Sequence, residues 1–450
     1  MGYRKRRLNP HWVTLIKRED TGLHDRPTTR FYLMNALFEK IKTFDTSKWA
    51  VATLLVLWAS TTFSIALMEI AFVAVLVLWL LSRIPTSGLR FRIADTGRAD
   101  RIMWGALAAF FLIVLASFLV SEYPRESFRG VLKIAKPLLI FLMVADLFRD
   151  GSNRRRFDIA FLAAFLIVTV DSSIQYAFGK SLLRGYPAQD SSAGLRLVGP
   201  FGDFGKMGSY LILVIPVFVM RFWSEFRAGA TRKNSFYALA LALTAFMLLY
   251  LTRCRGPVVA LVIAIGLLCL WKRWFKFLGL GVIVLLVGIV MAPRHVIIHK
   301  DAEGKEQSVV ERFELWKRAL DVIDTKPWLG TGINTYDVAH EKYDTRQNWR
   351  VRGYYAHNGY LQLTAEIGIP GILFFLIFLV FFFLRGLRQA NAVRGSPEEG
   401  KLLGIIAGLL AFLIYALSDT NLQSPQPLMA FWFMAGILLA SQRPRSSKIS

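Results

Sequence analysis

Residues 372–384 read "ILFFLIFLVFFFL", a run with no polar side chain. Together with the residues before it, the apolar stretch covers 362–384 and reaches the ~20 residues that an α-helix needs to cross a bilayer. Continuous apolar runs, rather than alternating apolar and polar residues, favour helices over a membrane β-barrel. Because 54% of the 450 residues are hydrophobic, we predict an all-α, polytopic integral membrane protein.

About twelve transmembrane helices are expected from runs of this kind. The first two form a tight pair broken at Ser60, Thr61 and Thr62, where a single re-entrant hairpin is an alternative. The expected spans lie near 49–65, 66–82, 102–120, 131–148, 158–178, 206–223, 235–252, 257–271, 276–292, 362–384, 402–418 and 427–440.

The short loops determine the expected orientation, because lysine and arginine gather on the cytoplasmic side of a membrane. Compact basic segments such as "RDGSNRRRF", "RAGATRKN", "KRWFK" and "RPRSSK" fall on one side, which we assign to the cytoplasm. The predicted organisation is a basic cytoplasmic N-terminal segment (1–48), transmembrane helices 1–9 (49–292), a periplasmic loop (293–357), transmembrane helices 10–12 (358–440) and a cytoplasmic tail (441–450).

Charge and the N-terminal segment add two expectations. The net charge of +24 follows from the inside-positive bias, and no nucleic-acid-binding module is present, so no nucleic acid is expected as a partner. Residues 1–33 are polar and basic and lack the apolar core of a signal peptide. Met34 would serve equally well as a start, so the sequence leaves open whether 1–33 belong to the natural protein.

Two long connections, 179–205 and 293–357, face outward in this topology. Long loops in compact proteins are usually functional or disordered. The second contains apolar residues at helical spacing, so we expect an amphipathic helix there, followed by the glycine-rich turn "WLGTGINTY". The apolar positions of that helix are Val309, Phe313, Trp316, Leu320 and Ile323.

Arginines next to outward helix ends are candidate ligand contacts. Arg253 and Arg255 lie in the short turn of "LLYLTRCRGPVVAL", and Arg196 precedes glycines 199, 202 and 205. Arginine near a membrane usually faces a polar cavity and a partner, and its guanidinium offers paired donors that match phosphate oxygens. The alternative is a positive side chain that reaches from a helix end to the lipid head groups.

Polar residues also open the helix that contains the first stretch. Asn358, Gln362 and Glu366 repeat every four residues and therefore share one face. Capping explains an asparagine at a helix start but not the two deeper residues, so we expect this face to line a cavity within the bundle. His357 then stands at the mouth of that cavity, where it can act as a base at neutral pH.

Metal and disulfide chemistry are not expected. His295 and His299 have a spacing that can bind zinc on a helix, but no Glu-bearing HExxH pattern or carboxylate pair completes a site. Cys254 and Cys269 are too few for a disulfide framework and are expected to remain unpaired.

Three stretches together resemble the O-antigen ligase and polymerase superfamily of bacterial membrane glycosyltransferases. They are "RLVGPFGDFGKMGSYLILVIP", "LTRCRGPVVAL" and the pair "RALDVIDTKPWLGTGINTY" and "YYAHNGYLQLTAEIGIPGILFF". The chain differs from the expected pattern at Cys254, where a serine is usual, and at Asp203, where an asparagine is usual.

The resemblance implies a function and roles. The donor would be a glycan on undecaprenyl diphosphate, and the acceptor would be lipid A-core or a growing glycan. Arg196 and Arg255 would contact the donor diphosphate, supported by Arg253, Asn358, Gln362 and Glu366. His357 would activate or orient the acceptor hydroxyl. The reaction would need no cofactor or metal, would invert the anomeric centre, and would take place at the periplasmic face of the bacterial inner membrane, among membrane lipids.

Two alternatives remain beside an O-antigen ligase. A polymerase of the same superfamily, acting on O-antigen or exopolysaccharide, would use the same lipid-linked donor. A transporter of lipid-linked glycans would need matching broken helices in two halves, which the sequence does not display. The sequence does not predict the sugars, the linkage or the oligomeric state.

Overall fold

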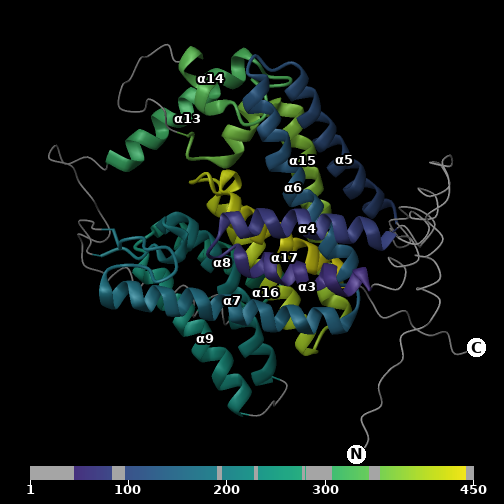
Figure 1. The fold of residues 1–450 in the computed structure, drawn as a ribbon, viewed down its shortest axis with the longest axis vertical. Coiled ribbons are helices and arrows are strands. Elements are labelled where there is room, and N and C mark those ends of the chain that lie inside the picture. Colours follow the sequence, from purple (N-terminus) through teal and green to yellow (C-terminus); the bar gives the residue numbers. More distant parts are fainter. Residues whose placement is uncertain are drawn as a thin grey trace, which may run out of the picture.

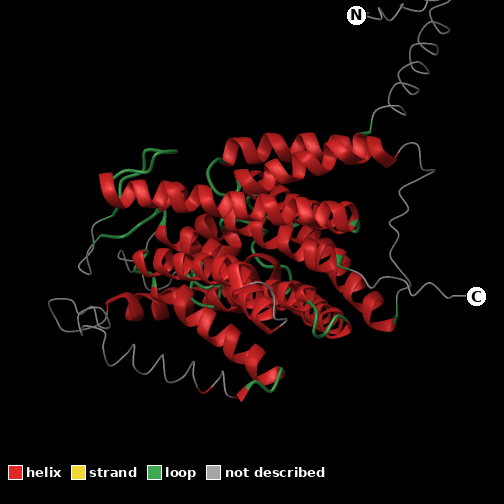
Figure 2. Cartoon of the chain, turned by 90° about the horizontal axis from the view of Figure 1, so that it is seen from below, coloured by secondary structure: helices red, strands yellow, loops and turns green. Residues whose placement is uncertain are grey.

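The structure, a computed structural model, describes residues 45–83, 97–189, 195–227, 232–275, 279, 307–343 and 355–441. Every regular element in this part of the chain is helical (Figure 2). The helices are α3 (Thr46–Ser60), α4 (Ile65–Arg83), α5 (Arg98–Leu119), α6 (Pro124–Leu147), α7 (Gly151–Phe178), α8 (Phe204–Arg227), α9 (Arg232–Leu251), α10 (Arg255–Trp271), α13 (Gln307–Thr325), α14 (Tyr336–Tyr343), α15 (Gly359–Ala392), α16 (Pro397–Tyr415) and α17 (Pro425–Ala440), with 3-10 turns η2 (Gly199–Phe201) and η4 (Asn421–Gln423).

The all-α membrane class is confirmed, whereas the number of spans stays a prediction. Within the described residues, five helices are long and apolar enough to cross a membrane: α4, α5, α7, α8 and α15. Shorter apolar helices cover Ser235–Leu251, Arg255–Trp271 and Pro425–Ala440. The expected span at 276–292 lies outside the described residues, apart from Gly279.

The break between the first two helices lies where the sequence places it. The hydroxyls of Ser60, Thr61 and Thr62 donate to the carbonyl oxygens of the residues three positions earlier, at 2.8, 2.7 and 2.7 Å. Such bonds satisfy carbonyls that the end of a helix leaves without an amide partner. The chain therefore leaves α3 at this point and begins α4 at Ile65.

Glycines bring α16 and α8 into close contact. Gly400, Gly404 and Gly408 lie on one face of α16, and a Cβ atom at any of them would come within 2.6 Å of an atom of α8. Small residues spaced by four let membrane helices approach this closely. The pairing matters for function, because the outward ends of α8 and α16 carry the polar residues described below.

Helices α13 and α14 form a separate layer at one end of the bundle (Figure 1). The predicted amphipathic helix is present, and its apolar positions divide between buried and exposed. Ile323 is buried, whereas Phe313 and Leu320 are exposed, and the Val309 side chain lies outside the described residues. The face of α13 that packs against α14 and α15 consists of small and branched residues. These residues are Ala319, Val322 and Ile323, which pack against Tyr336, Ala356 and Ala365.

Candidate functional site

Helix α15 consists of two segments, 359–367 and 369–392, that meet at a kink. Gly368 has φ 76° and ψ 173°, and a Cβ atom there would lie 2.1 Å from the Trp328 carbonyl oxygen. The Ile369 amide donates to the Pro327 carbonyl oxygen at 2.7 Å. Only glycine fits this backbone and this approach. The segment 369–392 is about 36 Å long at ~1.5 Å per residue, enough to cross a bilayer by itself.

The kink changes the interpretation of Glu366. Its carboxylate is buried and accepts bonds from the Asn334 amide at 2.8 Å and the Tyr336 amide at 3.4 Å. The Gln362 side-chain amide donates to the same carboxylate at 3.2 Å. The Glu366 carboxylate thus holds the 330–336 turn, and Gln362 supports it through its bond to Glu366. That these two residues line a cavity stays a prediction.

Replacing Glu366 should loosen that turn. In Glu366→Gln, one acceptor becomes an N–H donor opposite the Asn334 amide, and the buried donor left without a partner should cost about 1–3 kcal/mol. We expect a lower unfolding temperature in detergent and faster proteolysis within 326–336. Full stability combined with lost transferase activity would instead return Glu366 to the reacting groups.

His357 is fastened to the outward end of α16. The Asn358 side chain accepts from the amides of Tyr360 and Leu361 at 3.0 and 3.1 Å, so the capping role expected for it is confirmed. The Gly359 amide donates to the Ala416 carbonyl oxygen at 2.7 Å. His357 has φ 45°, which costs a non-glycine residue about 1–3 kcal/mol and is typical of functional positions.

Asp419 is the residue that sequence reasoning missed. Its Oδ1 lies 3.9 Å from His357 Nδ1, and its Oδ2 accepts from the Tyr415 hydroxyl. Burial would raise the pKa of Asp419, but the nearby His357 imidazole, the Tyr415 hydroxyl and the Thr420 amide outweigh burial and lower it. A charged carboxylate thus faces the histidine. The available signal was the polar run 418–421 after an apolar span.

Arg196 is held by its backbone. It pairs with Gln189 through two backbone bonds of 2.8 and 3.0 Å, and the next residue, Leu197, donates to the Leu251 carbonyl oxygen at 3.0 Å. The buried Gln175 side chain of α7 accepts from the Val198 and Gly199 amides at 3.0 and 2.8 Å. The Arg196 guanidinium then stacks on Phe204, 4.7 Å from the ring centroid.

The second arginine turn joins α9 to α10. Arg253 has φ 52°, and its guanidinium lies 4.5 Å from the Tyr250 ring centroid. Arg255 is the first residue of α10 and is exposed. No carboxylate among the described residues forms an ion pair with Arg196 or Arg253, and the Nε atom of each is buried without a hydrogen-bond partner.

Cys254 links this turn to the histidine. Its Sγ lies 3.6 Å from the Tyr415 hydroxyl, and a Cβ atom on Gly256 would come within 2.5 Å of the Tyr415 ring. Burial raises the pKa of the Cys254 thiol to about 11, so the thiol stays protonated. Both cysteines are free, as expected.

Tyr415 and Asp419 therefore form the centre of the site. Arg196 and the second arginine turn approach from the α8 and α10 side, since a Cβ atom on Gly205 would lie 3.2 Å from both Asp203 and Asp419 carboxylate oxygens. His357 approaches from α15. The predicted residues Arg196, Arg253, Arg255 and His357 are thus grouped at one end of the bundle.

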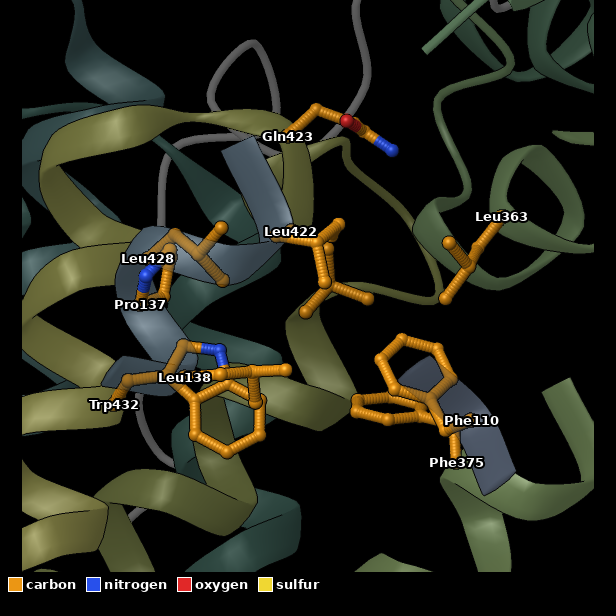
Figure 3. A pocket seen from close by; sticks show the side chains of 10 residues that line it. Phe110, Pro137, Leu138, Leu363, Phe375, Leu422, Gln423, Leu428 and Trp432 are labelled. Carbon is orange, nitrogen blue, oxygen red and sulfur yellow. The ribbon is translucent and has the colours of Figure 1, made fainter. Parts of the chain in front are cut away.

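A small apolar pocket adjoins the site (Figure 3). Leu422, three residues after Asp419, lies between the two sides of this pocket, and the Gln423 amide lies at its rim. The remaining lining comes from helices α5, α6, α15 and α17: Phe110, Ile134, Pro137, Leu138, Leu363, Phe375, Leu428 and Trp432.

Comparison with known proteins gives a consistent result. Residues 239–376 match the family model described as O-antigen ligase. The chain is 24% identical to the exopolysaccharide production protein ExoQ of Rhizobium meliloti over 155 residues, which make up 33% of this chain and 35% of that protein. It is 21% identical to an uncharacterized protein of Haemophilus influenzae over 312 residues, 62% of this chain and 73% of that protein. The match to ExoQ thus spans about a third of that relative's length.

Proposed function

We propose that this chain, part of which matches the O-antigen ligase family, is a glycosyltransferase that uses a glycan linked to undecaprenyl diphosphate as donor. The favoured reaction joins O-antigen polysaccharide to the lipid A-core acceptor at the periplasmic face of the inner membrane. The proposal uses no cofactor and no metal. It rests on the grouping of Arg196, the 253–255 turn and His357 around Tyr415 and Asp419.

The arginines carry the donor side of the proposal. Arg196 and Arg253 have no carboxylate partner among the described residues, and aromatic rings hold their guanidinium groups in place. Uncompensated guanidinium groups in a partly buried place attract an anion. We assign the diphosphate to Arg196 and the exposed Arg255, with Arg253 in support.

The chemistry then follows from the donor. The acceptor oxygen attacks the donor sugar at C1, the C1–O bond to the diphosphate breaks, and the electron pair leaves with the diphosphate. The arginines stabilise the negative charge that grows on the leaving oxygen. His357, with Asp419 beside it, takes the proton of the acceptor hydroxyl. Attack from the side opposite the diphosphate inverts the anomeric centre.

A polymerase is the second candidate, and the similarity to an exopolysaccharide production protein favours keeping it. The two enzymes share donor chemistry and differ in acceptor. The glycan profile of a deletion strain separates them. Lipid A-core without O-antigen, alongside accumulated lipid-linked polymer, would identify a ligase. Caps of a single repeat unit would identify a polymerase.

The topology has a direct test. In a background with Cys254 and Cys269 replaced by serine, Asp324→Cys on α13 should react with a membrane-impermeant thiol reagent in intact spheroplasts. Arg394→Cys, in the turn between α15 and α16, is the matched control, because both positions are exposed. It should react only after permeabilisation. The reverse pattern would invert the proposed orientation and reject the periplasmic site.

Metal independence is tested with a chelator. Transfer from purified lipid-linked donor should persist in EDTA at the rate measured without it, because the two arginine sites supply the positive charge that a metal would otherwise provide. Loss of turnover in EDTA, restored by one divalent ion, would contradict this. His295 and His299, which lie outside the described residues, would then be the first ligands to replace.

A further inference from the structure

A second cavity lies far from the arginine and histidine site. It has a volume of about 240 Å³ and is bounded by α7, α8, α9, α16 and α17, which are all labelled in Figure 1. Lys401 lines this cavity, whereas Tyr415 of the same helix lies in the site described above. Tyr415 lies fourteen positions beyond Lys401 on α16, about 21 Å at ~1.5 Å per residue.

The cavity has an apolar interior and a charged rim. Aromatic and aliphatic side chains such as Phe161, Phe218 and Met434 line the interior, and five charged residues line the rim. Those five are Asp158, Arg221, Glu225, Glu398 and Lys401. An apolar interior beneath a charged rim fits an amphipathic molecule, with its chain inside and its head group at the rim.

The charges on the rim do not cancel. Lys401 pairs with Asp158 at 2.5 Å, and Arg221 pairs with Glu225 at 2.9 Å. Glu398 adds a third carboxylate against two cations, which leaves one net negative charge. The Glu225 side chain is only 12% exposed. Its second carboxylate oxygen is buried and accepts no hydrogen bond. A buried acceptor without a donor is costly, above all when it is charged.

We propose that this cavity binds a phospholipid with a primary ammonium head group, of the phosphatidylethanolamine type. The ammonium group donates to the Glu225 carboxylate and neutralises the excess negative charge. The lipid phosphate meets Arg221, whose side chain is 57% exposed and has guanidinium donors beyond the one bonded to Glu225. The upper part of an acyl chain fills the apolar interior between α7 and α9.

The charge pattern also excludes other common lipids by chemistry. A choline head group carries no N–H donor and cannot satisfy Glu225. A glycerol head group leaves the lipid anionic against a rim that is already negative, and like charges repel. The proposal does not depend on the transferase reaction, because the cavity and the arginine site share no residue.

Lipid retention by the purified full-length protein tests the proposal. Delipidated protein is mixed with phosphatidylethanolamine, phosphatidylcholine or phosphatidylglycerol carrying identical acyl chains, and bound lipid is counted by native mass spectrometry. We expect the ethanolamine lipid to be retained and to raise the unfolding temperature most. Glu225→Gln should weaken its retention about ten-fold, as expected for loss of a charge-assisted hydrogen bond. Glu122→Gln, in the α5–α6 loop, should not.

A second variant guards against misfolding of the first. Leu241→Trp on α9 fills the cavity and leaves both ion pairs intact. It should reduce retention of the ethanolamine lipid while donor binding at the arginine site persists. Equal retention of all three lipids by the wild-type protein would overturn the proposal, as would unchanged ethanolamine preference in either variant.

Discussion

The variant His357→Ala should bind the lipid-linked donor as the wild type does and transfer its glycan about 10²–10⁴-fold more slowly. The alanine removes the group that takes the acceptor proton, whereas the diphosphate contacts at Arg196 and Arg255 remain. Donor affinity and the single-turnover rate, measured on the same purified protein, separate these two effects.

Two companion variants make the assignment specific. Asp419→Asn removes the negative charge 3.9 Å from His357 Nδ1 and should slow transfer less than loss of the histidine does. His340→Gln changes a buried histidine of α14 that contacts Tyr336, and it should affect stability rather than the rate of bound donor. If His357→Ala abolished donor binding but left the rate of bound donor intact, His357 would belong to the diphosphate site.

The variant Arg196→Ala should weaken donor binding and also slow transfer from bound donor, by about 10²–10³-fold in rate. The guanidinium contacts the diphosphate before the reaction and stabilises additional charge as the C1–O bond breaks. The donor dissociation constant and the single-turnover rate should therefore both change. In His357→Ala only the rate should change.

Arg184→Ala is the matched control for that experiment. Arg184 lies in the same outward segment and also stacks on an aromatic ring, Tyr186, at 5.3 Å. Its guanidinium, however, already donates to the Phe63 carbonyl oxygen and the Tyr186 hydroxyl. Normal transfer by Arg184→Ala and slow transfer by Arg196→Ala would support the assignment. Equal losses in both would show that any arginine of this loop matters only for folding.

The sequence by itself determined the fold class. Long apolar runs in lipid form α-helices, because each backbone amide and carbonyl must find a hydrogen-bond partner and the helix supplies one. Local chemistry also determined helix boundaries such as the break at Ser60–Thr62 and the cap at Asn358, where side chains bond to backbone groups a few residues away. These interactions are short in sequence, and short patterns encode them.

The sequence predicted part of the candidate site but not its organisation. Arg196, Arg255 and His357 were recognisable because charged residues at outward helix ends are rare and costly. Asp419 was not, since its role depends on the 3.9 Å approach to a histidine 62 positions earlier. The spacing of Gln362 and Glu366 placed them on one face of a helix, as observed, but could not show that Gly368 bends the helix beyond them.

Only the tertiary structure decided which partners the polar residues meet. Glu366 accepts from the amides of Asn334 and Tyr336, which belong to a turn that reaches α15 because Gly330 allows the backbone to approach. The α13 face was decided in the same way: Ala319 packs inward and Phe313 does not, because close approach favoured the small side chain over the most apolar one. Hydrophobic periodicity reports which faces avoid water, whereas the shape of the neighbouring helices determines which face is buried.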